Sequence, residues 1–321
     1  MKLKLIAAVL AAGTMLSQVA IAQDGPLVVY NPAGSAGELI IDAFKAKYPE
    51  VSISAINAGV GELFTRMAAE KANPQGDVIL CASSEAFLAN PDLFAPYDSV
   101  ELANFEAEVV AADHSFYGCS MPLQAFIVNT NLMTEDQYPR SWADLAKPEL
   151  EGKLVLANPS LSGSAYAQLA QILQLHGWDV AQKVMKNARF TTSSQSVFQD
   201  VGRGEIEVGV TGEVNVKTMM DEGYPVVAIY PEDGTGLRFD ASAIIAGGPN
   251  PDNAKLFLDF ANSREAHELV VSTNRRSVRK DVDAPAGLMP TSEVPTFAYD
   301  DQKAADTRDE NLAKFDELFS Q

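Results

Sequence analysis

The side-chain types that most often carry catalysis or bind metals are sparse and scattered in this sequence. His114, His176 and His267 are its three histidines, and none of them lies in an HExxH motif or at metal-ligand spacing from another histidine or cysteine. Ser164 lies in a Ser-Gly-Ser-Ala stretch, which differs from the GxSxG turn that exposes a hydrolase nucleophile. The sequence therefore predicts no catalytic residue, no metal site and no cofactor.

One loop has part of a dinucleotide-binding motif. Residues 57–61 follow a predicted strand and precede a predicted helix, as such a loop would. However, Phe64 stands where the third glycine of the motif is required, and the strand is the second of the chain instead of the first. We conclude that this loop is no evidence for a nucleotide.

Polar loops of small residues recur where a predicted strand ends and a helix begins. In open α/β sheets ligands bind outside these strand ends, where the free N–H groups and dipole of a helix start attract anions. The alternative is that each loop only caps its helix. Five such loops without a catalytic cluster favour a cleft that binds a ligand without reacting with it. The loops are residues 31–35, 57–61, 82–84, 158–164 and 211–213. The candidate ligand-binding residues on them and on the helices that follow are Asn31, Gly34, Ser35, Gly59, Val60, Gly61, Ser83, Ser162, Gly163, Ser164, Tyr166, Thr211 and Glu213.

The densest positive patch of the chain is residues 274–280, with the sequence NRRSVRK. An arginine there could hold a phosphate or carboxylate through a bidentate contact. The alternative is a solvated face at the C-terminus of a helix, where cations are mildly favourable. Both interpretations stay open, and Arg275 and Arg276 join the candidate ligand-binding residues.

The first 22 residues have the organisation of a cleaved signal peptide. Two lysines precede an apolar run at residues 5–16, and residues 20–22 form a small-x-small cleavage site. A membrane-spanning helix needs about 20 apolar residues, and polar residues interrupt this run. The mature chain is therefore expected to begin at Gln23 and to be soluble in the periplasm of a Gram-negative bacterium.

The mature chain is strongly acidic. Removal of residues 1–22, which hold two lysines and no acidic residue, takes the net charge from −19 to −21. This sign argues against nucleic acid as a partner, because its binding depends on basic patches that neutralise phosphates. The length of 321 residues suits two lobes, by the prior of roughly 150 residues per domain.

Cys81 and Cys119 are the only cysteines. An oxidising compartment permits a disulfide between them. Each also adjoins an apolar run, as a buried free cysteine does. The sequence leaves both alternatives open.

Short β-type runs alternate with helix-periodic segments along the mature chain, which indicates an α/β fold with mainly parallel sheets. Strands are predicted at residues 27–30, 51–56, 77–81, 153–157, 206–210, 226–230 and 242–246. Helices are predicted at residues 36–48, 61–72, 84–89, 164–175, 252–263, 264–272 and 302–319, with two more that begin at residues 178 and 213. Residues 123–129 and 232–236 have the composition of connections between two lobes. The alternative is two consecutive domains with a linker near residues 135–148.

Four segments resemble periplasmic solute-binding proteins of bacterial ABC importers. They are residues 56–77 (INAGVGELFTRMAAEKANPQGD), 158–166 (NPSLSGSAY), 230–236 (YPEDGTG) and 253–265 (NAKLFLDFANSRE). Within that family they resemble the ferric-ion-binding-like branch, which includes binders of hexose phosphates, pyridoxal phosphate, thiamine and 2-aminoethylphosphonate. The resemblance covers nearly the whole mature chain.

The resemblance implies a type II, two-lobed periplasmic binding protein fold with a two-strand hinge. Each lobe is expected to be a mainly parallel sheet flanked by helices. Residues 1–22 are then a signal peptide, residues 23–125 plus 240–300 one lobe, residues 126–239 the other, and residues 301–321 a C-terminal helix. The implied partners of this expected monomer are a small ligand and an ABC permease in the inner membrane.

The ligand implied by the resemblance is a small anion. Ferric binders of this branch carry adjacent tyrosines in the second lobe, whereas no two tyrosines of this chain are adjacent. Residues 162–164 resemble the anion-holding loop of phosphate-ester and phosphonate binders. This favours a phosphate ester or a phosphonate such as 2-aminoethylphosphonate, with Glu213 or Asp240 available for an amino group. Ferric ion is the alternative, and a secreted enzyme on the same fold is disfavoured because no nucleophile–base pair is recognisable.

Overall fold

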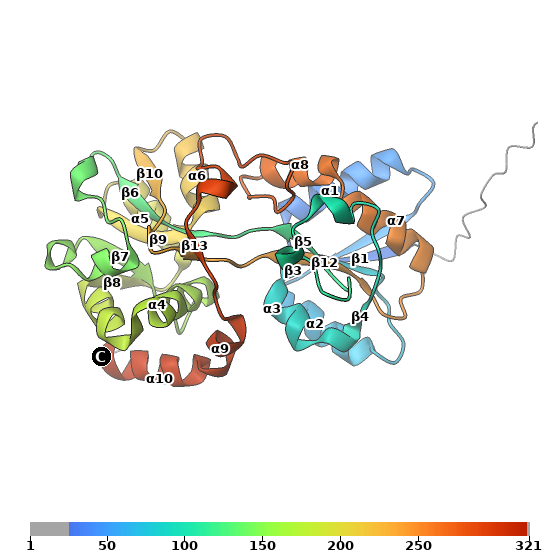
Figure 1. Cartoon of the computed structure of the whole chain (residues 1–321), viewed down its shortest axis with the longest axis horizontal. Helices are drawn as coiled ribbons and strands as arrows, with labels where there is room; N and C mark the ends of the chain where they lie inside the picture. The colour runs from blue at the N-terminus through green and yellow to red at the C-terminus, as the bar shows by residue number, and fades with distance from the viewer. Residues whose placement is uncertain (1–25, 320–321) are drawn as a thin grey trace, which may run out of the picture.

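The chain forms two α/β lobes that lie side by side and are joined by crossing segments (Figure 1). The computed structural model describes residues 26–319. The predicted signal peptide at residues 1–22 lies outside these described residues. Among residues 26–319, none of the helices combines the length and the apolar composition that a bilayer-spanning segment needs.

The first lobe is built around a six-stranded mixed sheet. Its strands are β1 (Leu27–Asn31), β2 (Ile53–Asn57), β3 (Val78–Ser83), β4 (Phe94–Ala95), β5 (Tyr117–Ser120) and β12 (Asp240–Ile245). The order is β2-β1-β3-β12-β4, with β5 also paired to β12. β1 runs parallel to β2 and β3, whereas β12 returns from later in the chain and runs antiparallel to β3, β4 and β5.

The second lobe contains a five-stranded mixed sheet with the order β10-β6-β9-β7-β8. Its strands are β6 (Gln124–Asn129), β7 (Leu154–Ala157), β8 (Ala188–Thr191), β9 (Val208–Gly212) and β10 (Val226–Ile229). β7 runs parallel to β8 and β9, and β6 runs antiparallel to β9 and β10. The α/β class is confirmed, and both sheets are mixed because strands that enter from a crossing segment run against their neighbours.

Each sheet has helices on both faces, so its central strands are buried on both sides, whereas the edge strands β2 and β8 remain partly exposed. In the first lobe Leu27 and Val29 point into one core and Tyr30 into the other, as strand alternation requires. The helices that cover the first core are α1 (Ser35–Lys47), α7 (Pro251–Ala261) and α8 (Arg264–Ser272), and those that cover the second are α2 (Val60–Glu70) and α3 (Ser84–Ala89). The second lobe is flanked by α4 (Gly163–Asn187), α5 (Ser194–Gly202) and α6 (Glu213–Asp221).

The chain passes between the lobes three times. The first two passages lie at residues 121–123 and 230–239. The predicted connection at residues 232–236 lies within the second passage, whereas residues 124–129 of the other predicted connection form β6 of the second sheet. The third, at residues 273–295, was not predicted. It leads from α8 to β13 (Thr296–Phe297), which pairs in parallel with β11 (Thr235–Gly236). The division into lobes remains our proposal. The composition of the two sheets supports the predicted boundaries near residues 125 and 240, whereas the predicted first lobe up to residue 300 includes the third crossing.

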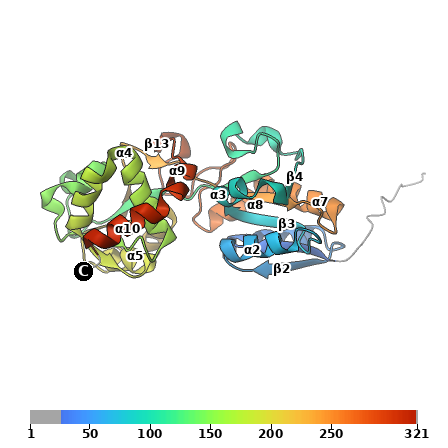
Figure 2. The same ribbon diagram turned by 90° about the horizontal axis from the view of Figure 1, so that it is seen from below.

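The C-terminal segment packs on the second lobe. The predicted helix at residues 302–319 is interrupted at Thr307 and forms α9 (Asp301–Asp306) and α10 (Arg308–Phe319). Figure 2 shows both helices against the second lobe beside α4. Phe315 is buried in the second-lobe core, where its ring centroid lies 5.2 Å from that of Phe190.

Cys81 on β3 and Cys119 on β5 form a disulfide. Both strands pair with β12, so the bond ties together the two strands that flank the returning strand. Of the two alternatives that the sequence left open, the structure contains the bonded one.

We predict that removing this disulfide lowers the free energy of unfolding by about 4 kcal/mol, because the bond closes a loop with a sequence separation of 38 residues. Urea unfolding of the Cys81→Ala/Cys119→Ala protein would measure the loss. The wild type with reductant is the control and should match the double variant. Equal stability of oxidised and reduced wild type would contradict the prediction.

Candidate ligand-binding site between the lobes

The loops at the carboxyl ends of the strands face the crossing segments. The N–H of Ser84, at the end of β3, donates to the carbonyl oxygen of Phe239 in the second crossing (3.0 Å). The N–H of Glu213, at the end of β9, donates to the carbonyl oxygen of Leu123 in the first crossing (2.9 Å). The helix starts that follow these strands therefore border the space between the lobes.

Three serine hydroxyls meet where α4 and α5 begin. The Oγ atom of Ser194 lies 2.5 Å from that of Ser162 and 2.9 Å from that of Ser164. Ser162 also caps α4 by accepting from the N–H of Ala165. Gly163 and Ser164 are exposed, so the hydroxyl cluster opens to solvent. We call Ser162, Ser164 and Ser194 the serine cluster.

Ser194 was not among the ligand-binding residues predicted from the sequence. Neither β8 nor α5 was predicted, because the side chains of β8 are exposed or half-buried and show no apolar alternation. A signal was nevertheless present in the run Thr-Thr-Ser-Ser at residues 191–194, which contains good helix caps. Ser193 caps α5 by accepting from the N–H of Gln195.

Some candidate ligand-binding residues of the first lobe have hydrogen-bond partners within the fold, and others lie at helix starts that no side chain caps. Asn31 is buried and fully engaged, because its side chain accepts from the N–H of Ala33 and donates to Gly34 and Asn57. Gly34 has a φ of 61°, which favours glycine. No side chain caps α1, α2 or α3, although the first N–H group of α3, that of Ser84, donates to the carbonyl oxygen of Phe239. Several of the predicted residues lie at these helix starts. These residues are Gly34, Ser35, Gly59, Val60, Gly61 and Ser83.

Arg276 and Glu213 bind each other in a buried ion pair. The Nε and Nη2 atoms of Arg276 donate to the two carboxylate oxygens of Glu213 at 2.9 and 2.8 Å, and both side chains are at most 2% exposed. Nη1 donates to Thr291, and the hydroxyl of Tyr230 donates to Glu213. Burial, followed by the charge of Glu213, raises the pKa of Tyr230 above its ordinary value.

The predicted role of Arg276 and Glu213 therefore needs correction. Both were expected to contact a ligand, but in this structure neither offers an atom to a solute. Arg276 belongs to the third crossing, whereas Glu213 begins α6 of the second lobe. The pair fastens the crossing segment to that lobe.

The remaining predicted residues, in the second lobe, in β12 and in the third crossing, have partners within the protein. Thr211 is buried and accepts from the side-chain amide of Asn215. The hydroxyl of Tyr166 donates to the carbonyl oxygen of Ala304 at 2.5 Å. Asp240 accepts from Ser120 at 2.8 Å and lies 3.7 Å from Arg275, and burial raises its pKa.

Glu85, Arg238 and Asp301 form a second cluster at the space between the lobes, which we call the carboxylate–arginine cluster. An Nη2 atom of Arg238 donates to Glu85, and its Nε atom lies 3.5 Å from Oδ1 of Asp301. Burial raises the pKa of Asp301 to about 7, with a further contribution from the charge of Glu85. These residues come from three distant segments, so no sequence spacing could have identified them.

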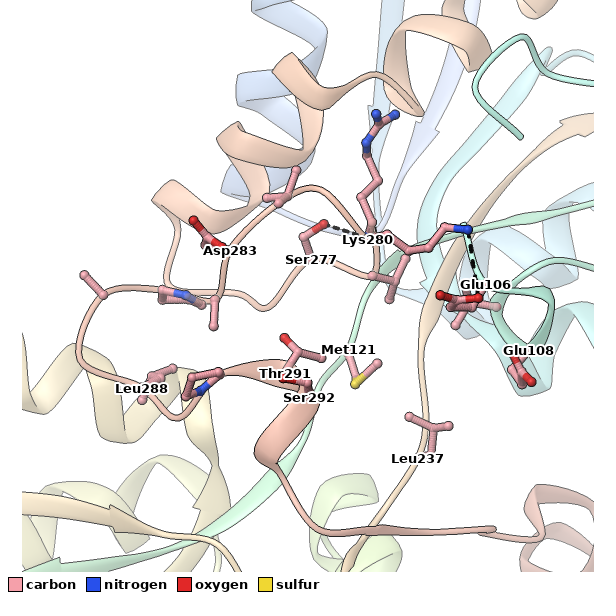
Figure 3. Close-up of a pocket in the computed structure, with 18 of the residues that line it drawn as sticks. Glu106, Glu108, Met121, Leu237, Ser277, Lys280, Asp283, Leu288, Thr291 and Ser292 are labelled. Atoms are coloured by element: carbon pink, nitrogen blue, oxygen red, sulfur yellow. Dashed lines mark hydrogen bonds and ion pairs between the residues drawn. The ribbon is translucent and has the colours of Figure 1, made fainter. Parts of the chain in front are cut away.

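The three crossings and residues 106–109 of the first lobe line an open cavity of about 730 Å³ (Figure 3). Met121 and Leu237 come from the first two crossings, and Leu288 and Thr291 come from the third. None of the predicted ligand-binding residues lines it. The cavity is therefore separate from the helix-start loops.

Two α/β lobes, three crossings and helix starts directed at the space between the lobes define a solute-binding protein of the two-lobed type. The sequence model of the bacterial extracellular solute-binding proteins matches residues 27–273 of this chain. The chain belongs to the family of bacterial extracellular solute-binding proteins. The resemblance inferred from the sequence is thereby confirmed at the level of the family.

Relatives with similar sequences are bacterial proteins of similar length. An uncharacterised protein of Haemophilus influenzae is 34% identical over 82% of this chain and 80% of its own length. A Sinorhizobium fredii protein whose name describes an ABC transporter periplasmic-binding protein is 29% identical over 74% and 70% of the two chains. A Salmonella typhi protein whose name describes a 2-aminoethylphosphonate-binding periplasmic protein is 26% identical over 75% and 73%.

Solved structures give the same fold. The periplasmic binding protein AfuA of Actinobacillus pleuropneumoniae, with fructose-6-phosphate bound, is 27% identical with a TM-score of 0.74, and the match covers 92% of this chain and 99% of that one. Iron-bound HitA of Pseudomonas aeruginosa is 21% identical with a TM-score of 0.76 over 92% and 99%. The second likeness concerns the fold alone. The two-lobed type II fold is thus confirmed.

We predict that Arg276→Met destabilises the protein by about 3–5 kcal/mol, because it leaves Glu213 as an unpaired buried charge. Arg275→Met is the matched control, since Arg275 is 36% exposed, and it should cost little. Denaturant unfolding of both variants measures the difference. A stable Arg276→Met protein that has lost only solute binding would restore the predicted ligand role.

Proposed function

We propose that the protein captures a small phosphorylated or phosphonate solute between its lobes and delivers it to an ABC permease in the inner membrane. It acts as a monomer in the periplasm after removal of residues 1–22, and it catalyses no reaction. The printed names of the Sinorhizobium and Salmonella relatives and the fructose-6-phosphate in AfuA support this role.

The serine cluster is the observation that carries the proposal. The starts of α4 and α5 converge there, and each supplies unbonded backbone N–H groups together with the positive end of its dipole. Three hydroxyls within 2.5–3.1 Å of one another can turn their hydrogens toward one anionic group. Because the chain without residues 1–22 carries a net charge of −21, these short-range contacts must outweigh a repulsive background.

Ferric-ion binding is the second candidate function. A Serratia marcescens relative, 25% identical, is named an Fe(3+)-binding periplasmic protein. Two phenols here are already engaged with carboxylates, Tyr30 with Glu70 and Tyr230 with Glu213. These observations support ranking the anion first.

We predict that Gly163→Asp reduces the affinity for anionic solutes at least about 100-fold, because it places a fixed negative charge at the start of α4. A Cβ atom at Gly163 would meet nothing within 4 Å, so the fold should tolerate the change. Calorimetric titration with 2-aminoethylphosphonate and with fructose 6-phosphate would measure the effect.

Gly163→Asn is the matched control, because it adds the same volume without the charge. It should retain most of the wild-type affinity for whichever probe binds. Equal affinities of the Asp and Asn variants would show that the anionic group of the solute does not bind at the start of α4.

We also predict that the purified protein is colourless and develops no visible phenolate-to-iron charge-transfer band when Fe³⁺ is added, because it lacks adjacent tyrosines. Absorption spectra during titration with ferric citrate provide the measurement. A band that saturates at one equivalent of iron would reverse the order of the two candidate functions.

A further inference from the structure

The cavity at the three crossings has the size and the lining of a small-molecule site. Its volume of about 730 Å³ lies within the range of roughly 300–1,000 Å³ that is usual for ligand pockets. Its floor is apolar, because Val109, Met121 and Val278 are nearly buried members of one core cluster and Leu237 packs against that cluster. Figure 3 shows Leu288 across the cavity from Leu237. A ligand with an apolar body would remove these surfaces from water, which favours its binding.

The two cations that line the cavity have carboxylate partners. Nζ of Lys280 lies 3.9 Å from Oε2 of Glu106 (Figure 3). The side chain of Arg279 is 3% exposed and donates hydrogen bonds to Asp281 and Glu101. Each positive charge is thereby balanced within the protein.

Two further carboxylates of the lining have no such partner. Within residues 26–319, neither the Glu108 nor the Asp283 side chain forms a hydrogen bond or an ion pair, although the charge of Asp283 acts on Arg264. Both residues are exposed, and Figure 3 shows them on opposite sides of the cavity. A hollow that is lined by charges of one sign attracts ligands of the opposite sign. The rim of the cavity is therefore complementary to a cation, and its floor is complementary to an apolar group.

We propose that this cavity binds a small organic cation, whose apolar body lies on the floor and whose charged group lies at the rim. None of the residues of the serine cluster lines the cavity, so this site is independent of the proposed anion site. Because all three crossings line the cavity, its occupant contacts every segment that connects the lobes. An occupant that fits one arrangement of the crossings better than another favours that arrangement of the lobes.

Three probes with the same alkyl chain test the charge of the ligand. NMR titration of the isotope-labelled mature protein at pH 7 would compare hexylamine, which is a cation, with 1-hexanol and hexanoate. We expect hexylamine to bind about fivefold more tightly than hexanol, the scale of an exposed ion pair, and hexanoate to bind most weakly. Butylamine should bind about tenfold more weakly than hexylamine, because each methylene buried on the floor improves the affinity about three- to fourfold.

The same substitution at two adjacent residues tests the location. Leu288 is half-buried and lines the cavity, whereas Met289 is exposed and does not. Leu288→Lys brings a positive charge into the cavity and should weaken hexylamine binding at least tenfold. Met289→Lys changes the net charge equally and should retain the wild-type affinity. In the wild type the largest amide shift changes should lie at Met121, Leu237, Val278 and Leu288.

A second pair of variants tests the carboxylates. The double variant Glu108→Gln/Asp283→Asn removes the two unpaired charges and should bring the affinities for hexylamine and hexanol within a factor of two. The control Glu151→Gln/Asp179→Asn makes the same chemical changes at exposed positions of the second lobe and should retain the preference for the amine. A cooperative thermal transition of each free variant verifies that it is folded.

The outcomes decide each part of the proposal. An amine preference that depends on Leu288 and on the two carboxylates supports it. Equal binding of hexylamine and hexanol to the wild type overturns the cationic class of the ligand. Equal effects of the two lysine substitutions, or no saturable shift at the amides of the cavity with any probe, overturn the site itself. None of these results changes the expected binding of an anion where α4 and α5 begin, which is tested with different probes.

Discussion

The buried ion pair between Arg276 and Glu213 is the interaction on which the arrangement of the lobes depends. Removing both charges from water costs several kcal/mol per ion, and only complete hydrogen bonding offsets this cost. Arg276 meets the condition, since Nε and Nη2 bind Glu213 and Nη1 binds Thr291. The pair fastens the third crossing to the second lobe. It also places a carboxylate at the start of α6, where the helix dipole would otherwise attract an anion. The starts of α4 and α5 carry no acidic residue, and the serine cluster lies there.

Most of the regular structure could be predicted from the sequence, because the strands and helices bury continuous or periodic apolar surfaces. The strands at β1, β3, β7 and β12 and the helices α3 and α8 follow directly from such patterns. β8 was missed because its side chains remain partly exposed, and α5 was missed with it. The third crossing could not be predicted because it has little regular structure of its own. It is held by Arg276 and by the pairing of two-residue strands.

The candidate site, too, could be predicted from the sequence only in part. The loop at residues 158–164 was identifiable, because serine and glycine at a helix start have a direct chemical meaning. Its partner Ser194 and the carboxylate–arginine cluster depend on which distant segments meet in space. The sequence also could not distinguish an arginine that binds solute from one that binds Glu213. In this account, closure of the lobes is driven by a solute that contacts both at once.

The central claim is that an anionic group binds the backbone N–H groups where α4 and α5 begin. NMR titration of the isotope-labelled mature protein with 2-aminoethylphosphonate and fructose 6-phosphate observes these groups individually. We expect the largest amide shift changes at Gly163, Ser164, Ala165 and Ser194, with smaller changes elsewhere in the second lobe. The account would be contradicted if the bound probe left the amide signals at the starts of α4 and α5 unchanged. Shifts would then appear instead for amides that line the cavity at the three crossings, such as those of Val278 and Leu288.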